Sequence, residues 1–473
     1  MATSKDILAS SGIKFGTSGA RGLVEQFTDS ACAAFTLAFV EVMKQNFDFG
    51  RVAIAVDRRP SSPAMAAACA GALKQVGLEV DYYGVIPTPA LALKAMQDGI
   101  PSIMITGSHI PFDRNGIKFY RPDGEIEKAD ELAILAAEAN VSDITPAVLE
   151  ESDAARLLYV QRYTSLFAEN SLAGKKIGVY EHSAAGREIN VEILQALGAE
   201  VVSLGRTETF VPIDTEAVSV EDQQQAKEWS AQYGFDAIIS TDGDGDRPLI
   251  ADEAGTWLRG DVLGLLCAKY LEVQALAVPV SCNTAIDKSG AFESVMRTRI
   301  GSPYVIEGMQ VLAGKYERVA GFEANGGFLL QTDVLVNDVP VKALPTRDAV
   351  LPALLVLAAA SKQGVDLSAL VSELPKRYTG SDRLKEFPTE RSKSLLADWE
   401  ADVKGVKDTL ELASDVVASN TTDGLRLTLE SGDIVHLRPS GNAPEFRCYA
   451  ESDSAEKADQ LVVSVLNKLA AYR

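Results

Sequence analysis

The chain contains the stretch Ile103-Met104-Ile105-Thr106-Gly107-Ser108-His109-Ile110-Pro111, an apolar run that stops abruptly in a polar loop. The continuous apolar half is typical of a strand that is buried on both faces. Ser108 is therefore predicted to lie just beyond the carboxyl end of that strand. Open α/β sheets bind their ligands at this edge. A serine in this position is a candidate carrier of a phosphoryl group.

The residues around this run alternate between strand and helix signals. Helices are predicted at 30–45, 61–77 and 87–99, and strands at 52–56, 80–83 and in the apolar run that begins at Ile103. The order is strand, helix, strand, helix, strand, which is typical of parallel strands joined by crossover helices. The polar loop of Ser108 follows the third strand of this unit.

The same order returns twice along the chain. The second copy extends from a strand at 176–180 to one at 235–240, and the third from 275–281 to 318–322. They end in Asp242-Gly243-Asp244-Gly245-Asp246-Arg247 and in Glu323-Ala324-Asn325-Gly326-Gly327. Each third strand thus ends in a polar, glycine-rich loop, and three such loops could face one cleft.

The last hundred residues follow a different pattern. We expect a linker at 377–383, a helix near 391–403, strands near 424–429 and 433–438, and a final helix at 454–472. The predicted fold is three similar α/β domains of βαβαβ type with mostly parallel sheets, and a smaller C-terminal α+β domain, around a central cleft. The predicted domains are 1–155, 156–255, 256–374 and 375–473.

Charge and composition narrow the class of protein. The net charge of −21 argues against nucleic acid or an anionic membrane as a partner. The apolar run at 349–360 is too short to span a bilayer, so it is predicted to be a buried helix. The five scattered cysteines are predicted to be reduced core thiols, and the first residues show no signal pattern. These features predict a cytoplasmic protein.

The acidic loop is a predicted metal site. Asp242, Asp244 and Asp246 alternate with glycines, and three carboxylates this close repel one another unless a cation neutralises them. Hard oxygen ligands point to Mg²⁺ or Ca²⁺. An EF-hand is excluded, because Arg247 occupies the position that needs glycine and strands flank the loop. A phosphate on Ser108 could be a further ligand.

Ser108 lacks the usual context of a hydrolase nucleophile. There is no G-x-S-x-G elbow, and with only three histidines in the chain a Ser-His-Asp relay is disfavoured. Lys118, on the next predicted strand, could return to the serine and serve as a general acid or base. A glycine-rich loop at 15–22 carries one cation, Arg21, and is not a P-loop because it lacks the lysine.

A loop near the C-terminus is a predicted phosphate site. It reads Arg438-Pro439-Ser440-Gly441-Asn442-Ala443-Pro444-Glu445-Phe446-Arg447. Arg438 and Arg447 could grip a phosphate with their forked guanidiniums. Ser440, the amide of Gly441 and Asn442 could donate to its remaining oxygens.

These four motifs, in this order, resemble the α-D-phosphohexomutase family along the whole chain. The resemblance implies three α/β domains and a smaller fourth domain, a phosphoserine, Mg²⁺, and interconversion of hexose 6-phosphate and hexose 1-phosphate. It also implies a hexose 1,6-bisphosphate activator. The partner is then a small sugar phosphate, and the enzyme a monomer or homodimer.

Individual residues can be carried over from the family. Ser108 matches the phosphoserine, Lys118 the acid/base lysine and Arg21 the arginine of the N-terminal loop, with His109 beside the serine completing the predicted catalytic set. The predicted metal ligands are Ser108, Asp242, Asp244 and Asp246. The predicted substrate-binding residues are Arg247, Glu323, Asn325, Arg438, Ser440, Gly441, Asn442 and Arg447.

The sequence departs from the family pattern at several positions. Ile110 replaces an asparagine, Asn325 a serine and Gly327 a histidine, and Asn442-Ala443 stands where Thr-Glu is common. The form Phe-Glu-Ala-Asn-Gly-Gly-Phe most resembles the phosphomannomutase subgroup. Phosphoglucomutase or phosphoglucosamine mutase are the nearest alternatives. A sugar phosphatase and a non-catalytic Ca²⁺- or sugar-phosphate-binding protein are alternatives of another class.

Overall fold

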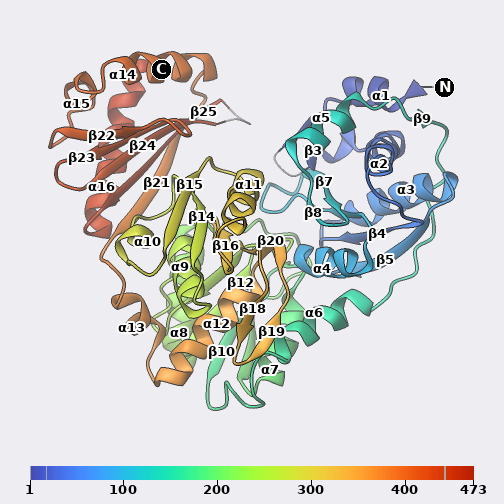
Figure 1. The fold of residues 1–473 in the computed structure, drawn as a ribbon, viewed down its shortest axis with the longest axis horizontal. Helices are drawn as coiled ribbons and strands as arrows, with labels where there is room; N and C mark the ends of the chain where they lie inside the picture. The colour runs from blue at the N-terminus through green and yellow to red at the C-terminus, as the bar shows by residue number, and fades with distance from the viewer. Residues whose placement is uncertain (1, 17–18, 441–443) are drawn as a thin grey trace.

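A computed structural model describes residues 2–16, 19–440 and 444–473 (Figure 1). Thr17, Ser18, Gly441, Asn442 and Ala443, which belong to two of the predicted ligand loops, lie outside the described residues. Four units follow one another along the chain, each built on its own large sheet. The predicted fold class is confirmed. The predicted boundaries remain predictions, and each falls between two of these sheets.

The first unit carries the Ser108 loop. Its parallel strands are β4 (Arg51–Val56), β5 (Glu79–Val85) and β6 (Ser102–Ile105), and antiparallel strands β7 (Arg114–Arg121) and β3 (Gly19–Leu23) extend the sheet. Short strands β2 (Lys14–Phe15) and β8 (Gly124–Glu125) complete it. The main helices are α2 (Asp29–Met43), α3 (Ser62–Gln75) and α4 (Thr88–Asp98).

The second and third units repeat this design. The second sheet has the order β11-β10-β12-β13, made of Glu200–Leu204, Lys176–Tyr180, Ala237–Thr241 and Pro248–Ala251. The third has the order β15-β14-β16-β17-β20, made of Ser294–Thr298, Ala275–Pro279, Val319–Phe322, Phe328–Leu330 and Leu344–Asp348. Their helices include α7 (Arg187–Ala196), α8 (Val220–Tyr233), α9 (Gly260–Tyr270) and α11 (Ser302–Ala313).

In each of these units, three of the described strands pair in parallel. After the third parallel strand the chain turns back as an antiparallel strand: β7 beside β6, β13 beside β12, and β17 beside β16. The polar loops with Ser108, the three aspartates and Glu323 therefore each connect a parallel strand to the strand that returns next to it. This brings Lys118, on β7, back toward the serine loop.

The fourth unit is an antiparallel sheet of order β21-β25-β24-β23-β22, made of Tyr378–Lys385, Glu445–Ser452, Ile434–Pro439, Leu425–Leu429 and Val416–Asn420. Helices α14 (Thr389–Ala401) and α16 (Ala455–Leu469) belong to it. The linker predicted at 377–383 is wrong, because residues 378–383 belong to strand β21, which pairs with β25. β21 is an edge strand whose side chains are mostly polar and half of whose residues are exposed, so its sequence resembles a linker.

The core is divided between the units. One apolar cluster is continuous from the first to the third unit, whereas the fourth has its own, around Phe387, Trp399 and Phe446. Helix α12 (Val350–Gln363) is the buried helix predicted for 349–360. All five cysteines are buried and free. No helix in the described part of the chain is long and apolar enough to cross a membrane.

Candidate active site

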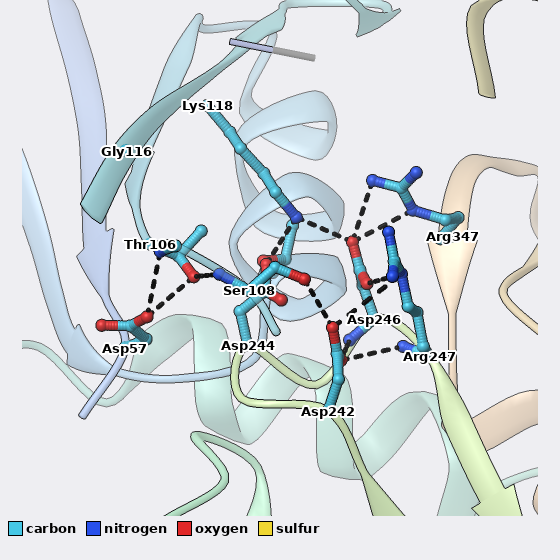
Figure 2. A network of polar contacts seen from close by, with 12 residues as sticks. Asp57, Thr106, Ser108, Gly116, Lys118, Asp242, Asp244, Asp246, Arg247 and Arg347 are labelled. Atoms are coloured by element: carbon cyan, nitrogen blue, oxygen red, sulfur yellow. Dashed lines mark hydrogen bonds and ion pairs between the residues drawn. The ribbon is translucent and has the colours of Figure 1, made fainter. Parts of the chain in front are cut away.

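The loop of Ser108 meets the loop of the three aspartates (Figure 2). The Ser108 hydroxyl is fully buried and donates a hydrogen bond of 2.7 Å to Oδ2 of Asp242. Ser108 has a φ of 52°, in the left-handed region that non-glycine residues seldom adopt. Gly243 allows the close approach, since a Cβ there would lie 2.8 Å from the Ser108 carbonyl oxygen. The backbone conformation thus directs this hydroxyl toward the acidic loop.

A buried carboxylate, that of Asp57, holds the Ser108 loop through hydrogen bonds. Asp57, just after β4, accepts hydrogen bonds from the Thr106 hydroxyl (2.8 Å) and the Gly107 amide (3.3 Å). The Thr106 hydroxyl in turn accepts from the Ser108 amide at 2.8 Å. Arg59, also buried, pairs with Asp57 at 3.2 Å and donates to the carbonyl oxygen of Ser108 at 3.0 Å. Burial raises the pKa of Asp57, and the neighbouring Arg59 opposes that shift.

Sequence reasoning missed Asp57 and Arg59. They follow the buried strand β4 directly, so the edge-of-sheet argument applied to Ser108 would have found them. Their position also bears on the unusual Ile110. Arg59 donates to the backbone carbonyl oxygen of Ile110 at 2.6 Å, and that contact does not depend on which side chain stands there.

The acidic loop has the donor set for a divalent cation. Carboxylate oxygens of Asp242, Asp244 and Asp246 lie within 4.8 Å of one another, and all three residues are buried. Lys118 donates to Oδ2 of Asp244 (2.5 Å) and to Oδ2 of Asp246 (2.9 Å). Oδ1 of Asp244 and Oδ1 of Asp246 are buried without a hydrogen-bond partner. Lysine and a metal could therefore use different oxygens of the same two carboxylates, and the residues fit a divalent metal.

The electrostatics of the loop also favour a cation. Burial raises the pKa of Asp242 well above its usual range, and the charges of Asp244 and Asp246 raise it further. Burial opposes ionisation of Asp246 too, but Arg347 and Lys118 outweigh it and lower its pKa. Asp244 and Asp246 thus accept hydrogen bonds from cationic side chains, whereas Asp242 accepts them from the Ser108 hydroxyl and backbone amides, with Nε of Arg247 3.9 Å from its Oδ2. A metal would supply the missing positive charge.

The imidazole of His109 accepts a hydrogen bond from a neighbouring arginine. Arg247 donates through Nη1 to Nδ1 of His109 at 2.9 Å. Burial, with Arg247 beside it, lowers the pKa of His109 to about 3, so the imidazole is neutral near pH 7. Ser108 Oγ lies 3.3 Å from the same nitrogen. The arrangement speaks against a serine–histidine relay, because Nδ1 is occupied by Arg247.

A cleft of about 770 Å³ opens beside this network. Residues from all four units line it, and it brings together these predicted site residues: Arg21, His109, Arg247, Glu323, Asn325, Arg438 and Arg447. Burial and the neighbouring Arg247 lower the pKa of Arg21 to about 10, which leaves it protonated near pH 7. The cleft thus concentrates arginines in a chain whose overall charge is −21.

Arg347 links the acidic loop to the third loop and was not predicted. Its guanidinium donates to Asp246 at 3.1 Å and to Glu323 at 3.2 Å. Burial opposes its charge, but Asp246 and Glu125 outweigh that effect and raise its pKa well above the usual value. The only signal in the sequence is an arginine at the end of strand β20. Asn325 shapes the third loop, as its Oδ1 accepts from the Gly327 amide at 3.0 Å.

The fourth unit contributes the far wall of the cleft. Arg438 ends β24 directly opposite Arg447 on β25, and Arg438 Nε lies 2.9 Å from an oxygen of Asp423. Ser440 is buried, and its amide donates to the Glu445 carbonyl oxygen at 2.8 Å. The predicted ligands Gly441 and Asn442 are outside the described residues.

Comparisons with known proteins place the chain in a family. Four models described as phosphoglucomutase/phosphomannomutase domains match it: domain I at 12–143, domain II at 158–255, domain III at 259–378 and the C-terminal domain at 388–468. A phosphomannomutase from Salmonella muenchen is 53% identical over 98% of this chain and 97% of its own length. The chain belongs to the phosphoglucomutase/phosphomannomutase family.

Other members of the phosphoglucomutase/phosphomannomutase family show the range of identities. A phosphomannomutase from Sinorhizobium fredii is 44% identical over 96% of this chain and 99% of its own length. A phosphoglucosamine mutase from Brucella anthropi is 28% identical over 97% and 98%. Membership confirms the predicted enzyme class, a phosphotransferase of the isomerase type, and the identities favour the phosphomannomutase subgroup.

The fold of the phosphoglucomutase/phosphomannomutase family extends to distant solved structures. The N-acetylphosphoglucosamine mutase of Aspergillus fumigatus, solved with GlcNAc-6P and magnesium, superposes with a TM-score of 0.60. It is 15% identical, and the match covers 99% of this chain and 98% of that one. At this identity the likeness shows a shared fold.

Proposed function

We propose that the chain interconverts mannose 6-phosphate and mannose 1-phosphate, through a phosphorylated Ser108 and a hexose 1,6-bisphosphate. The observation that carries this proposal is the buried Ser108 hydroxyl, 2.7 Å from Asp242, between a carboxylate triad and an open, arginine-rich cleft. Mannose is favoured because the relatives at 53% and 44% identity are phosphomannomutases, whereas the phosphoglucosamine mutase is 28% identical.

The metal in this proposal is Mg²⁺. Asp242, Asp244 and Asp246 would hold it together with a phosphate on Ser108, since Mg²⁺ takes a few carboxylates plus phosphate oxygens. The buried oxygens of Asp244 and Asp246 that accept no hydrogen bond support this assignment. The distant mutase solved with magnesium supports it as well. When bound, the ion would supply positive charge that stabilises the transferring phosphoryl group.

Phosphoryl transfer then needs only residues that already face one another. A free hydroxyl of the sugar attacks the phosphorus on Ser108, so that a new P–O bond forms and the bond to Ser108 Oγ breaks. The ammonium group of Lys118 gives a proton to Oγ as that bond breaks and regains one from the attacking sugar hydroxyl, so it ends the step charged as it began. The released Ser108 hydroxyl donates to Asp242, which is the contact seen in the structure. Arg247 stabilises charge on the moving group, and neutral His109 accepts a hydrogen bond from it.

The remaining residues bind the sugar phosphate and recognise its sugar. Glu323 and Asn325 would contact sugar hydroxyls, and Arg21 the substrate near the serine. The phosphate that is not reacting would lie against Arg438, Ser440, Gly441, Asn442 and Arg447. After the first transfer the bisphosphate turns over in the cleft, and its other phosphate returns to Ser108. A hexose 1,6-bisphosphate would prime the dephosphorylated enzyme.

The remaining parts of this proposal concern partners and location. The partner is a small sugar phosphate, with no nucleic acid and no membrane. The enzyme is cytoplasmic and works as a monomer or homodimer. Size-exclusion chromatography with light scattering tests the oligomeric state.

Three measurements test the proposed function together. We expect the highest kcat/KM for mannose phosphates among mannose, glucose and glucosamine phosphates, assayed with bisphosphate activator. Ser108→Ala should lose activity by at least about 10³-fold, because the phosphoryl carrier is gone. Intact-mass analysis should find a phosphorylated fraction that Ser108→Ala lacks.

The same measurements separate the alternatives. Near wild-type turnover by Ser108→Ala would refute the mechanism. A higher kcat/KM for glucose or glucosamine phosphate would change the sugar and keep the chemistry. Net release of phosphate faster than isomerisation would indicate a phosphatase. Absence of turnover together with absence of phosphate on Ser108 would indicate a passive binding protein.

A further inference from the structure

Three arginines form one cross-strand row in the fourth unit. Arg383 on β21 lies directly opposite Arg447 on β25, and Arg447 lies directly opposite Arg438 on β24. Residues directly opposite one another in a sheet project from the same face. All three arginines line the cleft, so this face of the sheet is the one turned toward the substrate. Arg383 belongs to strand β21, most of which the sequence predicted to be a linker.

The row has more guanidiniums than carboxylates within ion-pair distance. Like charges directly opposite one another destabilise a sheet. Glu445 lies 3.4 Å from Arg383 and 3.5 Å from Arg447, and Asp423 lies 2.9 Å from Arg438. Three guanidiniums thus have two carboxylates within 4 Å, and the charge of Glu216, which also lines the cleft, acts on Arg447 as well. Nε of Arg447 is buried without a hydrogen-bond partner. The row retains charge and donors for an anion.

We propose that Arg383 is a third phosphate-binding arginine, and that the row Arg383–Arg447–Arg438 holds the phosphate that is not reacting. This rests on the proposed function, which supplies the sugar phosphate. The forked guanidinium matches the tetrahedral oxygens of a phosphate. A row of three such groups gives a phosphate several equivalent places to bind, which suits an enzyme that must hold either the 1-phosphate or the 6-phosphate in turn.

Charge on an edge strand is the competing explanation for Arg383, whose side chain is 42% exposed. In that case Arg383 would contribute no more to phosphate binding than another exposed cation of the same unit. The matched control is Lys393 on α14, an exposed cation of the same unit that pairs with Glu390 and is not among the residues that line the cleft. The variants are Arg383→Ala, Arg383→Gln and Lys393→Ala, each checked for its melting temperature.

The experiment has two readouts. The first is the binding of inorganic phosphate to each variant, followed by ³¹P NMR titration. The second is KM and kcat for mannose 1-phosphate. We expect Arg383→Ala and Arg383→Gln to weaken phosphate binding and raise KM about tenfold, with kcat within about threefold of wild type. Lys393→Ala should change neither.

Several outcomes would overturn the proposal. These are phosphate affinity of a folded Arg383 variant within twofold of wild type, or an equal loss in Lys393→Ala. If Arg383→Ala does not fold, Arg383→Gln is judged by the same criterion. If the wild-type chain isomerises no hexose phosphate, the proposed function fails, and the phosphate titration still tests the row by itself.

Discussion

At one end of the cleft Ser108 and the three aspartates are fully buried, whereas at the other end Arg383 and Arg447 keep 42% and 35% of their side chains exposed. The buried end is rich in carboxylates and needs a cation, while the exposed end is rich in guanidiniums and needs an anion. The first is held by hydrogen bonds between groups of three units. The second lies on one sheet whose core is separate.

This difference follows the work that each end would do. Bonds to phosphorus change only near Ser108, and preorganised charges in a dry site stabilise such a step far more than they would in water. The arginine row only has to hold a phosphate and release it when the sugar turns over. Partly exposed charges bind more weakly and exchange more readily, which is an advantage for that purpose. The comparison predicts a graded series of effects from the buried end to the exposed one.

The largest effect is expected for the metal loop. Asp244→Asn replaces one of the unpartnered Oδ1 ligands and weakens the contact to Lys118, so kcat should fall about 10³-fold. Chelation with EDTA should abolish wild-type activity, and added Mg²⁺ should restore it. Calorimetric titration with Mg²⁺ measures the metal affinity directly. Asp236→Asn is the control, a carboxylate of the same unit that pairs with Lys175. Full activity of Asp244→Asn would contradict the metal assignment.

The second largest effect is expected for Asp57, which positions the Ser108 loop without being one of the reacting groups. Asp57→Asn leaves the buried guanidinium of Arg59 without its charge partner, which should cost about 3 kcal/mol of unfolding free energy. The serine loop loses its anchor as well, and kcat should fall about 100-fold. Urea unfolding and steady-state kinetics measure both quantities. Asp123→Asn, at an exposed ion pair with Arg121, should change neither. Unchanged stability of Asp57→Asn would contradict this account.

The two ends also differ in how far the sequence predicts them. The strands that carry Ser108, Asp242 and Glu323 are continuous apolar runs followed by glycine-rich polar loops, so both their burial and their ends could be predicted. The connections that follow could be predicted less well. The antiparallel return of β13 and β17 depends on which strand the chain pairs with next, and local sequence does not determine that.

The residues that sequence reasoning missed share a physical cause. Asp57, Arg59 and Arg347 carry no glycine-rich motif, and their importance comes from partners far away in the chain. Arg347, for example, bonds to Asp246, and Arg59 to the carbonyl oxygen of Ser108. Arg383 was missed for another reason. An edge strand buries little apolar surface, so its residues lack the alternation by which strands are recognised.

At the exposed end, Arg438→Ala should have an intermediate effect. Arg438 lies opposite Arg447, and its side chain is 20% exposed. Its loss should therefore raise KM about thirtyfold while kcat changes far less. A split of this kind separates holding a phosphate from reacting with it. Steady-state kinetics in both directions of the reaction measure it. Arg391→Ala, on the exposed side of α14, is the control. A loss confined to kcat would place Arg438 among the reacting groups and contradict the comparison.

The smallest effect is expected for salt. Its effects on KM and kcat allow the arginine row and the Ser108 end of the cleft to be compared in the wild-type protein. Raising NaCl from about 50 mM to about 300 mM should raise KM about threefold, because mobile ions screen the partly exposed arginine row. The same change should leave kcat within about twofold, since the network around Ser108 is buried and screened much less. Removing one member of the row, as in Arg383→Ala, should flatten the salt dependence of KM, because fewer exposed charges remain to be screened. A salt-dependent fall in kcat at constant KM would contradict this prediction. It would mean that mobile ions screen the charges around Ser108 rather than the arginine row.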